Sequence, residues 1–301
     1  MAGPQIWLGW RHLPAGRGST TLRAGSKNFP ICFPRKFAER YTQFNMGRFR
    51  RLTRWLLSLL ATSYLGLVIL VGCEQRSLLY HPSHSPIPTQ TDASGLVPWR
   101  KDGRVIGFCH EVSNPKHIWL MLHGNAGQAQ GRKYALATLP TNDSFYVVEY
   151  PGFGTREGSP TFDSMNAAAV EAYQTLSQRF PNQPISVLGE SMGSGPASFL
   201  SHQSPRPERI ALVVPYDRLV SVAAEKKPYL PVSLILQDRW DNIASLQGFQ
   251  GRIDIYAATE DTIIPVAHAR NLAKNVANAH LHEFTGEHND WSHNHRVVLE
   301  D

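Results

Sequence analysis

The stretch Gly189-Glu190-Ser191-Met192-Gly193 decides the fold of this chain, because it lies between an apolar run and a run of small residues. The preceding residues 185–188 (ISVL) predict a short buried strand, and residues 194–198 (SGPAS) predict the start of a closely packed helix. Glycine at 189 and 193 leaves room where the strand and the helix approach each other, since side chains there would collide. The pattern therefore predicts a strained turn that projects the Ser191 hydroxyl away from the backbone.

Strands and helices alternate on both sides of this turn. Asp102-Gly103 predicts a tight turn before residues 104–112, so the first strands are expected to form an antiparallel hairpin. Further strands are expected at residues 117–122, 144–150, 185–188, 209–214, 252–257 and 280–284, and helices near 129–139, 162–179, 192–202 and 266–277. Short apolar strands separated by helices predict an α/β fold, in which a mostly parallel central sheet carries helices on both faces. Ligands of such sheets bind at the carboxyl ends of the strands.

The positive charge of the chain is confined to its N-terminal part. The 301 residues carry a net charge of +6, but residues 1–55 hold eleven Lys and Arg against one acidic residue. The remaining residues hold 19 basic and 23 acidic side chains, a net charge of −4. The globular part therefore has no excess of positive charge for phosphate groups, and we expect no nucleic acid partner.

Cysteine and histidine usage excludes two further classes of site. Cys32, Cys73 and Cys109 are too few and too scattered for a disulfide framework or a CxxC metal site. The thirteen histidines show no HExxH pattern. We therefore expect neither a metal ion nor another cofactor.

Residues 55–72 (WLLSLLATSYLGLVILVG) carry no charge and follow four arginines at positions 48, 50, 51 and 54. They predict either a transmembrane anchor or a signal peptide. Leu70-Val71-Gly72-Cys73 resembles the lipobox of bacterial lipoproteins, which favours cleavage before Cys73 and lipidation of its thiol; an uncleaved anchor is the alternative. Under both interpretations the chain after Cys73 lies on the non-cytoplasmic side of the membrane, the periplasm in a bacterium.

The same observations predict four regions. Residues 1–45 are expected to be an upstream extension of low order, with Met46 as the true start, and residues 46–73 to be the signal peptide or anchor. Residues 74–100 are rich in Pro, Ser and Thr, which predicts a tether. Residues 101–301 are expected to form the catalytic domain.

Several segments, in this order, resemble the α/β-hydrolase family of serine hydrolases over about residues 104–295. They are His123-Gly124-Asn125-Ala126-Gly127, Tyr150-Pro151-Gly152-Phe153-Gly154 with Gly158-Ser159-Pro160, the turn at Ser191, residues 258–265 (ATEDTIIP) and residues 286–290 (GEHND). The resemblance implies Ser191 as nucleophile, Asp261 as acid and His288 as base, in the chain order that the fold requires. It also implies an oxyanion hole formed by the backbone N–H groups of Asn125 and Met192, and with the membrane segment it is closest to anchored esterases and thioesterases.

These residue types suit acyl transfer. A serine hydroxyl is a weak nucleophile at neutral pH, so it needs a base such as His288 within hydrogen-bond reach. Asp261 would fix the tautomer of that imidazole and stabilise the imidazolium, and the two backbone N–H groups would stabilise the oxyanion.

Other residues compete for these roles. The rivals of Asp261 are Asp254, Asp217 and Glu260, of which Asp254 is expected inside a strand. The rivals of His288 are His280 and His282, which share one face of the last strand, and His293 and His295, which come late in the chain. An ordinary turn is the alternative for Asn125, since Asn-Ala-Gly is also typical of loops without an oxyanion role.

The chain departs from the family pattern in two places and carries an insertion. Pro151 stands where the family often has arginine, and only thirteen residues follow His288, so a final helix is expected to be short or missing. About 37 residues separate the sixth expected strand from the seventh, where these hydrolases carry a cap. Its apolar residues 229–236 and Trp240 suit either an acyl-chain pocket or simple packing on the sheet.

We therefore expect a serine hydrolase that cleaves ester or thioester bonds of small-molecule, acylated or lipid-like substrates at a membrane. A serine peptidase or amidase with the same triad is an alternative, because the motifs do not distinguish an ester from an amide. A membrane-anchored scaffold that binds without turnover is an alternative of another class.

Overall fold

The computed structural model describes residues 35–86, 95–293 and 296–299, with the side chains described from residue 46 onward. It divides into two compact units, residues 1–60 and residues 61–301. Helix α1 (Arg35–Leu79) belongs to both, and its part Met46–Leu79 is long and apolar enough to cross a membrane. The expected low order of residues 1–45 differs from the structure at residues 35–45, which are helical; residues 1–34 lie outside the described residues.

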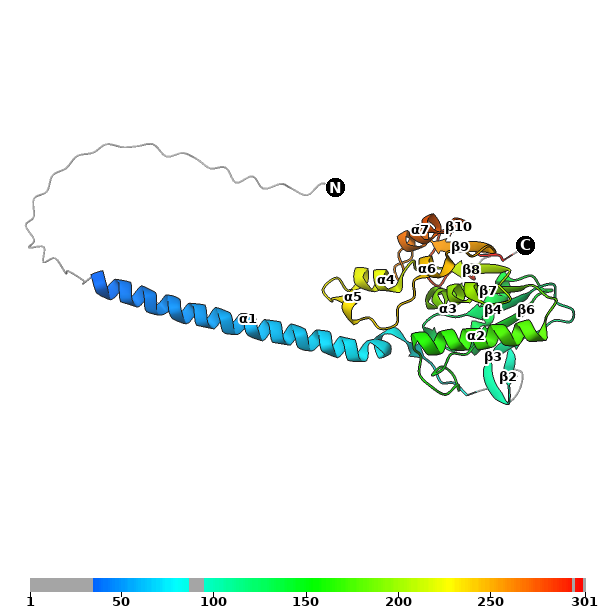
Figure 1. Cartoon of the computed structure of the whole chain (residues 1–301), viewed down its shortest axis with the longest axis horizontal. Helices are drawn as coiled ribbons and strands as arrows, with labels where there is room; N and C mark the ends of the chain where they lie inside the picture. Colours follow the sequence, from blue (N-terminus) through cyan, green and yellow to red (C-terminus); the bar gives the residue numbers. More distant parts are fainter. Residues whose placement is uncertain (1–34, 87–94, 294–295, 300–301) are drawn as a thin grey trace, which may run out of the picture. The chain divides into compact units, whose positions relative to one another are not determined.

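An eight-stranded sheet forms the centre of the second unit, in the order β10-β9-β8-β7-β4-β6-β3-β2 (Figure 1). From β10 to β6 all neighbours are parallel, whereas β3 runs antiparallel to both β6 and β2. The expected α/β fold with a mostly parallel sheet is confirmed. The strands are β2 (Val97–Lys101), β3 (Arg104–His110), β4 (Ile118–Leu122), β6 (Ser144–Val148), β7 (Ile185–Glu190), β8 (Arg209–Val213), β9 (Arg252–Ala258) and β10 (Ala279–Phe284).

The first two strands of this sheet form the expected hairpin. Asp102 and Gly103 connect them with φ angles of 49° and 78°. Positive φ at both central residues is the requirement of the tight turn that joins twisted antiparallel strands, and Asp-Gly meets it at low cost. The local sequence therefore determines this edge of the sheet.

Each face of the sheet has its own apolar core. Helices α2 (Phe162–Arg179), α3 (Ser194–Phe199), α6 (Asn242–Leu246) and α7 (Val266–Asn275) pack on the face that holds Ile118, Leu120 and Leu122. Trp119 and Met121 of the same strand point to the other face, which is covered by the 3₁₀ segment η1 (Ala129–Thr138) and by Trp291, Val297 and Leu299. Among the described residues after β10 there is no helix, in agreement with the short C-terminal segment.

The region after α1 differs from the predicted tether of residues 74–100. The helix continues to Leu79, Tyr80 is buried, and β1 (His81–Pro82) pairs with β5 (Ala126–Gly127). Strand β2 begins at Val97, before the predicted start of the domain at residue 101. Pro and Ser suggested a solvated linker, but the backbone here makes hydrogen bonds to the loop after β4, and only residues 87–94 lie outside the described part.

A small cap lies between β8 and β9, as predicted from the long insertion. It consists of α4 (Leu219–Lys226), α5 (Val232–Ile235) and α6. Trp240 at its end is buried and donates a hydrogen bond from Nε1 to Asn166 Oδ1 over 2.9 Å, so it packs against the helical layer.

The closest approach of helix to sheet occurs at the glycines of the central turn. A Cβ atom at Gly193 would overlap the Leu122 carbonyl, and one at Gly189 would lie 2.6 Å from Ala197 Cβ. The Leu122 carbonyl cannot move without shifting β4, and Ala197 Cβ cannot move without shifting α3.

We predict that Gly193→Ala lowers the free energy of unfolding by about 3 kcal/mol or more, because its Cβ has no space. Gly131→Ala is the matched control, since no atom lies within 4 Å of a Cβ at that position. Urea unfolding of the full chain in detergent measures both. Equal stability of the two variants would contradict the tight approach.

Candidate active site

The turn after β7 holds Ser191 in a strained conformation. Ser191 has a φ angle of 52°, in the left-handed region that non-glycine residues rarely adopt, and begins the short helix η2 (Ser191–Gly193). Its carbonyl accepts a hydrogen bond from Ser194 Oγ over 2.6 Å. Asn242 of α6 donates to the same Ser194 Oγ over 3.0 Å, so the cap region supports the turn.

Three residues from distant parts of the sequence meet at this turn. His288 Nε2 lies 2.8 Å from Ser191 Oγ, and His288 Nδ1 lies 2.6 Å from Asp261 Oδ2. All three side chains are buried. The structure therefore brings together the serine, histidine and aspartate that the sequence singled out, at hydrogen-bond distances suited to proton transfer.

The loop after β9 fixes the orientation of the aspartate. Asp261 Oδ1 accepts hydrogen bonds from the backbone N–H groups of Ile263 and Ile264, each over 2.8 Å. Its other oxygen, Oδ2, contacts His288. One carboxylate oxygen thus anchors the side chain and the other orients the imidazole.

The rival aspartates have other partners. Asp254 lies inside β9 and forms ion pairs with Arg209 and Arg252, at 2.6 and 2.8 Å. Asp217, after β8, contacts His268 Nδ1 over 2.8 Å. The latter is a second buried Asp–His pair, but its other histidine nitrogen contacts Glu225 at 3.0 Å instead of a serine.

Asn125 and Met192 line the same pocket as Ser191. The Asn125 carbonyl accepts a hydrogen bond from His81 N over 2.8 Å, and its side chain donates to the Leu79 carbonyl over 2.7 Å. The loop that carries Asn125 is therefore fixed by the residues that end and follow α1. Its oxyanion role stays a prediction.

Glu190 connects the turn at Ser191 to three other parts of the site. It was not among the site residues predicted from the sequence. Its carboxylate accepts hydrogen bonds from Gly124 N over 3.2 Å, from Tyr134 Oη over 2.6 Å and from Trp291 Nε1 over 3.0 Å. These partners belong to the loop after β4, to η1 and to the chain after His288. In the sequence Glu190 is visible only as an acidic residue directly before Ser191. Its position alone does not indicate which groups it contacts.

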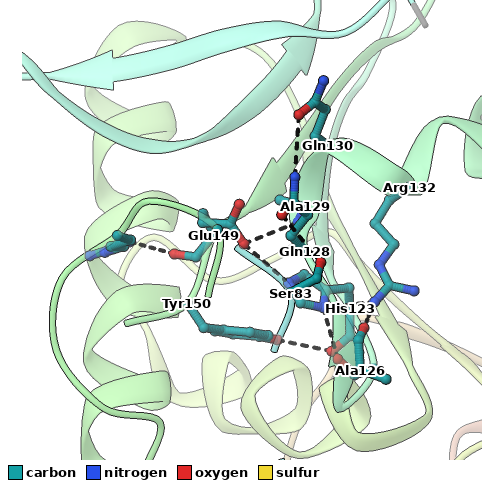
Figure 2. Close-up of polar contacts among 12 residues, drawn as sticks. Ser83, His123, Ala126, Gln128, Ala129, Gln130, Arg132, Glu149 and Tyr150 are labelled. Atoms are coloured by element: carbon teal, nitrogen blue, oxygen red, sulfur yellow. Dashed lines mark hydrogen bonds and ion pairs between the residues drawn. The ribbon is translucent and has the colours of Figure 1, made fainter. Parts of the chain in front are cut away.

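A buried polar cluster lies behind the loop after β4, and it was also missed from sequence (Figure 2). Glu149 Oε1 accepts a hydrogen bond from Ala129 N over 3.0 Å and lies 3.9 Å from His123 Nε2. Burial raises the pKa of Glu149 to about 7. Burial, with the nearby Arg132 guanidinium, holds the pKa of His123 well below its ordinary value, so this imidazole is neutral.

Above Ser191 the structure contains an apolar pocket of about 590 Å³. Its apolar walls come from the end of α1, the cap and the loop after β9: Leu67, Val71, Leu78, Leu79, Tyr216, Leu219, Val222, Ala223, Tyr229, Leu230, Val232, Ile235, Leu236, Ile263 and Ile264. The cap residues differ in their surroundings, because Leu230 lines the pocket whereas Trp240 packs on the helical layer. The acyl-chain role of the pocket stays a prediction. Within the described residues no group of His, Cys, Asp and Glu is arranged to hold a metal ion.

We predict that Glu149→Gln changes the pH dependence of stability. The folded protein holds the Glu149 proton more tightly than the unfolded chain, so its contribution is fully present below pH 4.5 and is lost as pH rises through about 7. Glutamine keeps an oxygen for Ala129 N and does not titrate. Between pH 4 and pH 8 the wild type should lose roughly 3 kcal/mol relative to the variant.

Thermal unfolding of both full chains in detergent across this pH range measures the difference. If the stability of the wild type and of Glu149→Gln changed with pH in the same way, ionisation of Glu149 would not destabilise the folded protein.

Comparisons with known proteins agree with this arrangement. No family model matches the chain. It is 28% identical over 222 residues to an uncharacterised protein of Mycobacterium tuberculosis, across 70% of this chain and 79% of that protein. The structure of the Pyrococcus furiosus esterase Pf2001 superimposes with a TM-score of 0.54 at 14% identity, across 70% of this chain and 91% of the esterase. The chain has the α/β-hydrolase fold.

The resemblance predicted from the ordered motifs is thereby confirmed at the level of the α/β-hydrolase fold. A further relative is the lysophosphatidylserine lipase ABHD12 of Danio rerio, which is 34% identical over 109 residues. That match spans 34% of this chain and 28% of the lipase. The names of these two proteins state an esterase and a lipase activity.

Proposed function

We propose that this α/β-hydrolase cleaves carboxylic ester or thioester bonds of acylated, lipid-like substrates through an acyl-enzyme at Ser191. The observation that carries the proposal is the hydrogen-bonded series Ser191, His288 and Asp261 at the base of an apolar pocket. An apolar pocket suits an acyl chain, and a serine beside a fixed imidazole suits attack on the carbonyl carbon at its end.

In the proposed reaction, Ser191 Oγ attacks the acyl carbonyl while His288 Nε2 takes its proton. Asp261, held by two backbone N–H groups, stabilises the imidazolium. Asn125 and Met192 donate backbone N–H groups to the oxyanion, and His288 returns the proton to the departing alcohol or thiol. Water then attacks the acyl-enzyme by the reverse sequence and releases the fatty acid.

The esterase and lipase activities of the two named relatives support the ester class for this chain. A peptidase or amidase would use the same triad, but the pocket offers few polar side chains to bind peptide groups: Gln75, Asn125, Lys226 and Lys227. The apolar walls thus favour the acyl substrate over the peptide.

The proposal includes a membrane location. Met46–Leu79 is long and apolar enough to span a bilayer, and the arginines before it are expected to stay in the cytoplasm. The catalytic domain would then lie on the opposite side. Cys73 is exposed within this helix, where a lipid could be attached.

We predict that a fluorophosphonate probe labels the wild-type chain and that Ser191→Ala and His288→Ala abolish labelling, because the nucleophile and its base are lost. Asp261→Asn should lower turnover of p-nitrophenyl butyrate by about 10⁴. Asp254→Asn is the matched control: Asp254 lies in β9 and pairs with Arg209 and Arg252, so this change should leave turnover within about tenfold. A folded wild type without labelling would favour the non-catalytic scaffold.

We also predict that Cys73 carries a lipid. Radiolabelled palmitate should label the wild type in cells and should not label Cys73→Ala, because the thiol is the attachment point. Cys32→Ala serves as the control. Equal labelling of the wild type and Cys73→Ala would exclude lipidation at this residue.

A further inference from the structure

The end of helix α1 forms part of the substrate pocket. Leu67, Val71 and Leu78 line the same cavity as Ser191. Polar contacts fix this arrangement: Gln75 Nε2 donates to the Ile235 carbonyl over 2.9 Å, and Gln75 Oε1 accepts from Gln237 N over 2.7 Å. The last turns of the apolar helix are therefore a wall of the site.

Helix length places this wall at the edge of the bilayer. Residues 55–72 contain eighteen residues without a charge, which span about 27 Å as a helix. The hydrocarbon core of a bilayer is about 30 Å thick, so this stretch is about the minimum length that crosses it. Leu67 and Val71 lie in its final two turns, and Gln75 and Arg76 follow at the membrane surface.

The cap and the loop after β9 expose apolar side chains beside this wall. Outside α1, the described residues contain five exposed large apolar side chains: Leu234 (80%), Tyr229 (60%), Ile263 (51%), Val97 (39%) and Val298 (37%). The first three are the most exposed, and they all belong to the segments that form the pocket mouth. Tyr64 of α1 reaches the same place, since its hydroxyl donates to the Tyr229 carbonyl over 2.8 Å. Apolar side chains gathered in this way mark a contact surface.

Basic residues flank the exposed apolar side chains. Lys226 and Lys227 line the pocket mouth directly before Tyr229, and Arg239 follows α5, where it donates to the carbonyls of Ser233 and Leu236. Long cationic side chains around an apolar tip are typical of segments that enter the membrane interface, because their charges remain among the headgroups. This surface adjoins a helix that is long and apolar enough to span a membrane, which favours lipid over a water-soluble protein as its partner.

We propose that the surface formed by Tyr229 and Leu234 of the cap and by Ile263 of the loop after β9 inserts into the lipid bilayer beside α1, so that the acyl chain of an ester enters the pocket directly from the membrane. The inference rests on the proposed hydrolase function and on the uncleaved form of α1, which keeps Leu67 and Val71 attached to the domain. It names the substrates as membrane-dissolved acyl esters. The ester carbonyl reaches Ser191 while the apolar chain exchanges lipid for the apolar walls of the pocket, with little exposure to water.

Membrane insertion is tested first without reference to activity. Leu234→Cys and Val97→Cys are made in a chain that carries Cys32→Ser and Cys73→Ser, labelled with an environment-sensitive fluorophore, and reconstituted into phosphatidylcholine–phosphatidylglycerol vesicles. We expect label at 234 to shift to the blue and to be quenched by doxyl-labelled lipids, whereas label at 97 does neither. Absence of lipid quenching at 234 would overturn the proposal, and disulfide cross-linking between two unlabelled Leu234→Cys chains would assign the surface to a second copy.

Substrate entry is tested with one surface variant and two substrates. Leu234 does not line the pocket, so Leu234→Asp should hydrolyse soluble p-nitrophenyl acetate within about twofold of the wild type. With a long-chain monoacyl ester in the same vesicles, we expect a loss of about tenfold, because a carboxylate resists entry into lipid. Val97→Asp is the control and should lose neither activity.

The two proposals fail in different ways. A wild type that hydrolyses neither substrate and is not labelled by fluorophosphonate would refute the hydrolase function. If Leu234→Asp hydrolysed both the vesicle ester and the soluble ester normally, only the proposal of entry from the membrane would be refuted, and the hydrolase function would stand.

Discussion

The rest of the site depends on the close approach of α3 to the sheet at Gly189 and Gly193. With no side chain at either position, the backbone turns from β7 into helix within a few residues and holds Ser191 at a φ of 52°. The strain of this turn is compensated by dense packing and by hydrogen bonds from Ser194 and Asn242 around it. A looser turn would let the hydroxyl rotate away from the imidazole 2.8 Å distant.

The strained turn is also the point where separate loops are joined. Glu190 accepts hydrogen bonds from the loop after β4 and from the chain that follows His288. The Glu190 carboxylate, directly before Ser191, is thus hydrogen-bonded both to the loop that carries Asn125 and to the segment that follows His288. Since these loops come from different strands, their mutual placement relies on this buried acceptor and on the parallel sheet that aligns the strand ends.

The same loop after β4 connects the site to the apolar helix. The Leu79 and His81 backbone groups bond to Asn125, and β1 pairs with β5. The last turns of α1 therefore line the pocket, and the buried Tyr80 that follows the helix packs into the domain. In the proposed hydrolysis of water-insoluble esters, such a wall would shorten the path between the lipid and Ser191.

The sequence by itself determined the alternation of strands and helices, the hairpin turn at Asp102-Gly103 and the tight turn at Ser191. It also singled out Asp261 and His288 as the partners in the hydrogen-bonded series with Ser191. These features depend on local periodicity and on residue types at short spacing, which act within a few residues of the chain. Only the tertiary structure decided what Glu190, Glu149 and His123 contact, that residues 74–86 pack on the domain, and that the end of α1 closes the pocket. The contacts of these residues join positions from 20 to 162 apart, and their strength comes from burial that exists only once the sheet, the cap and the helix have come together.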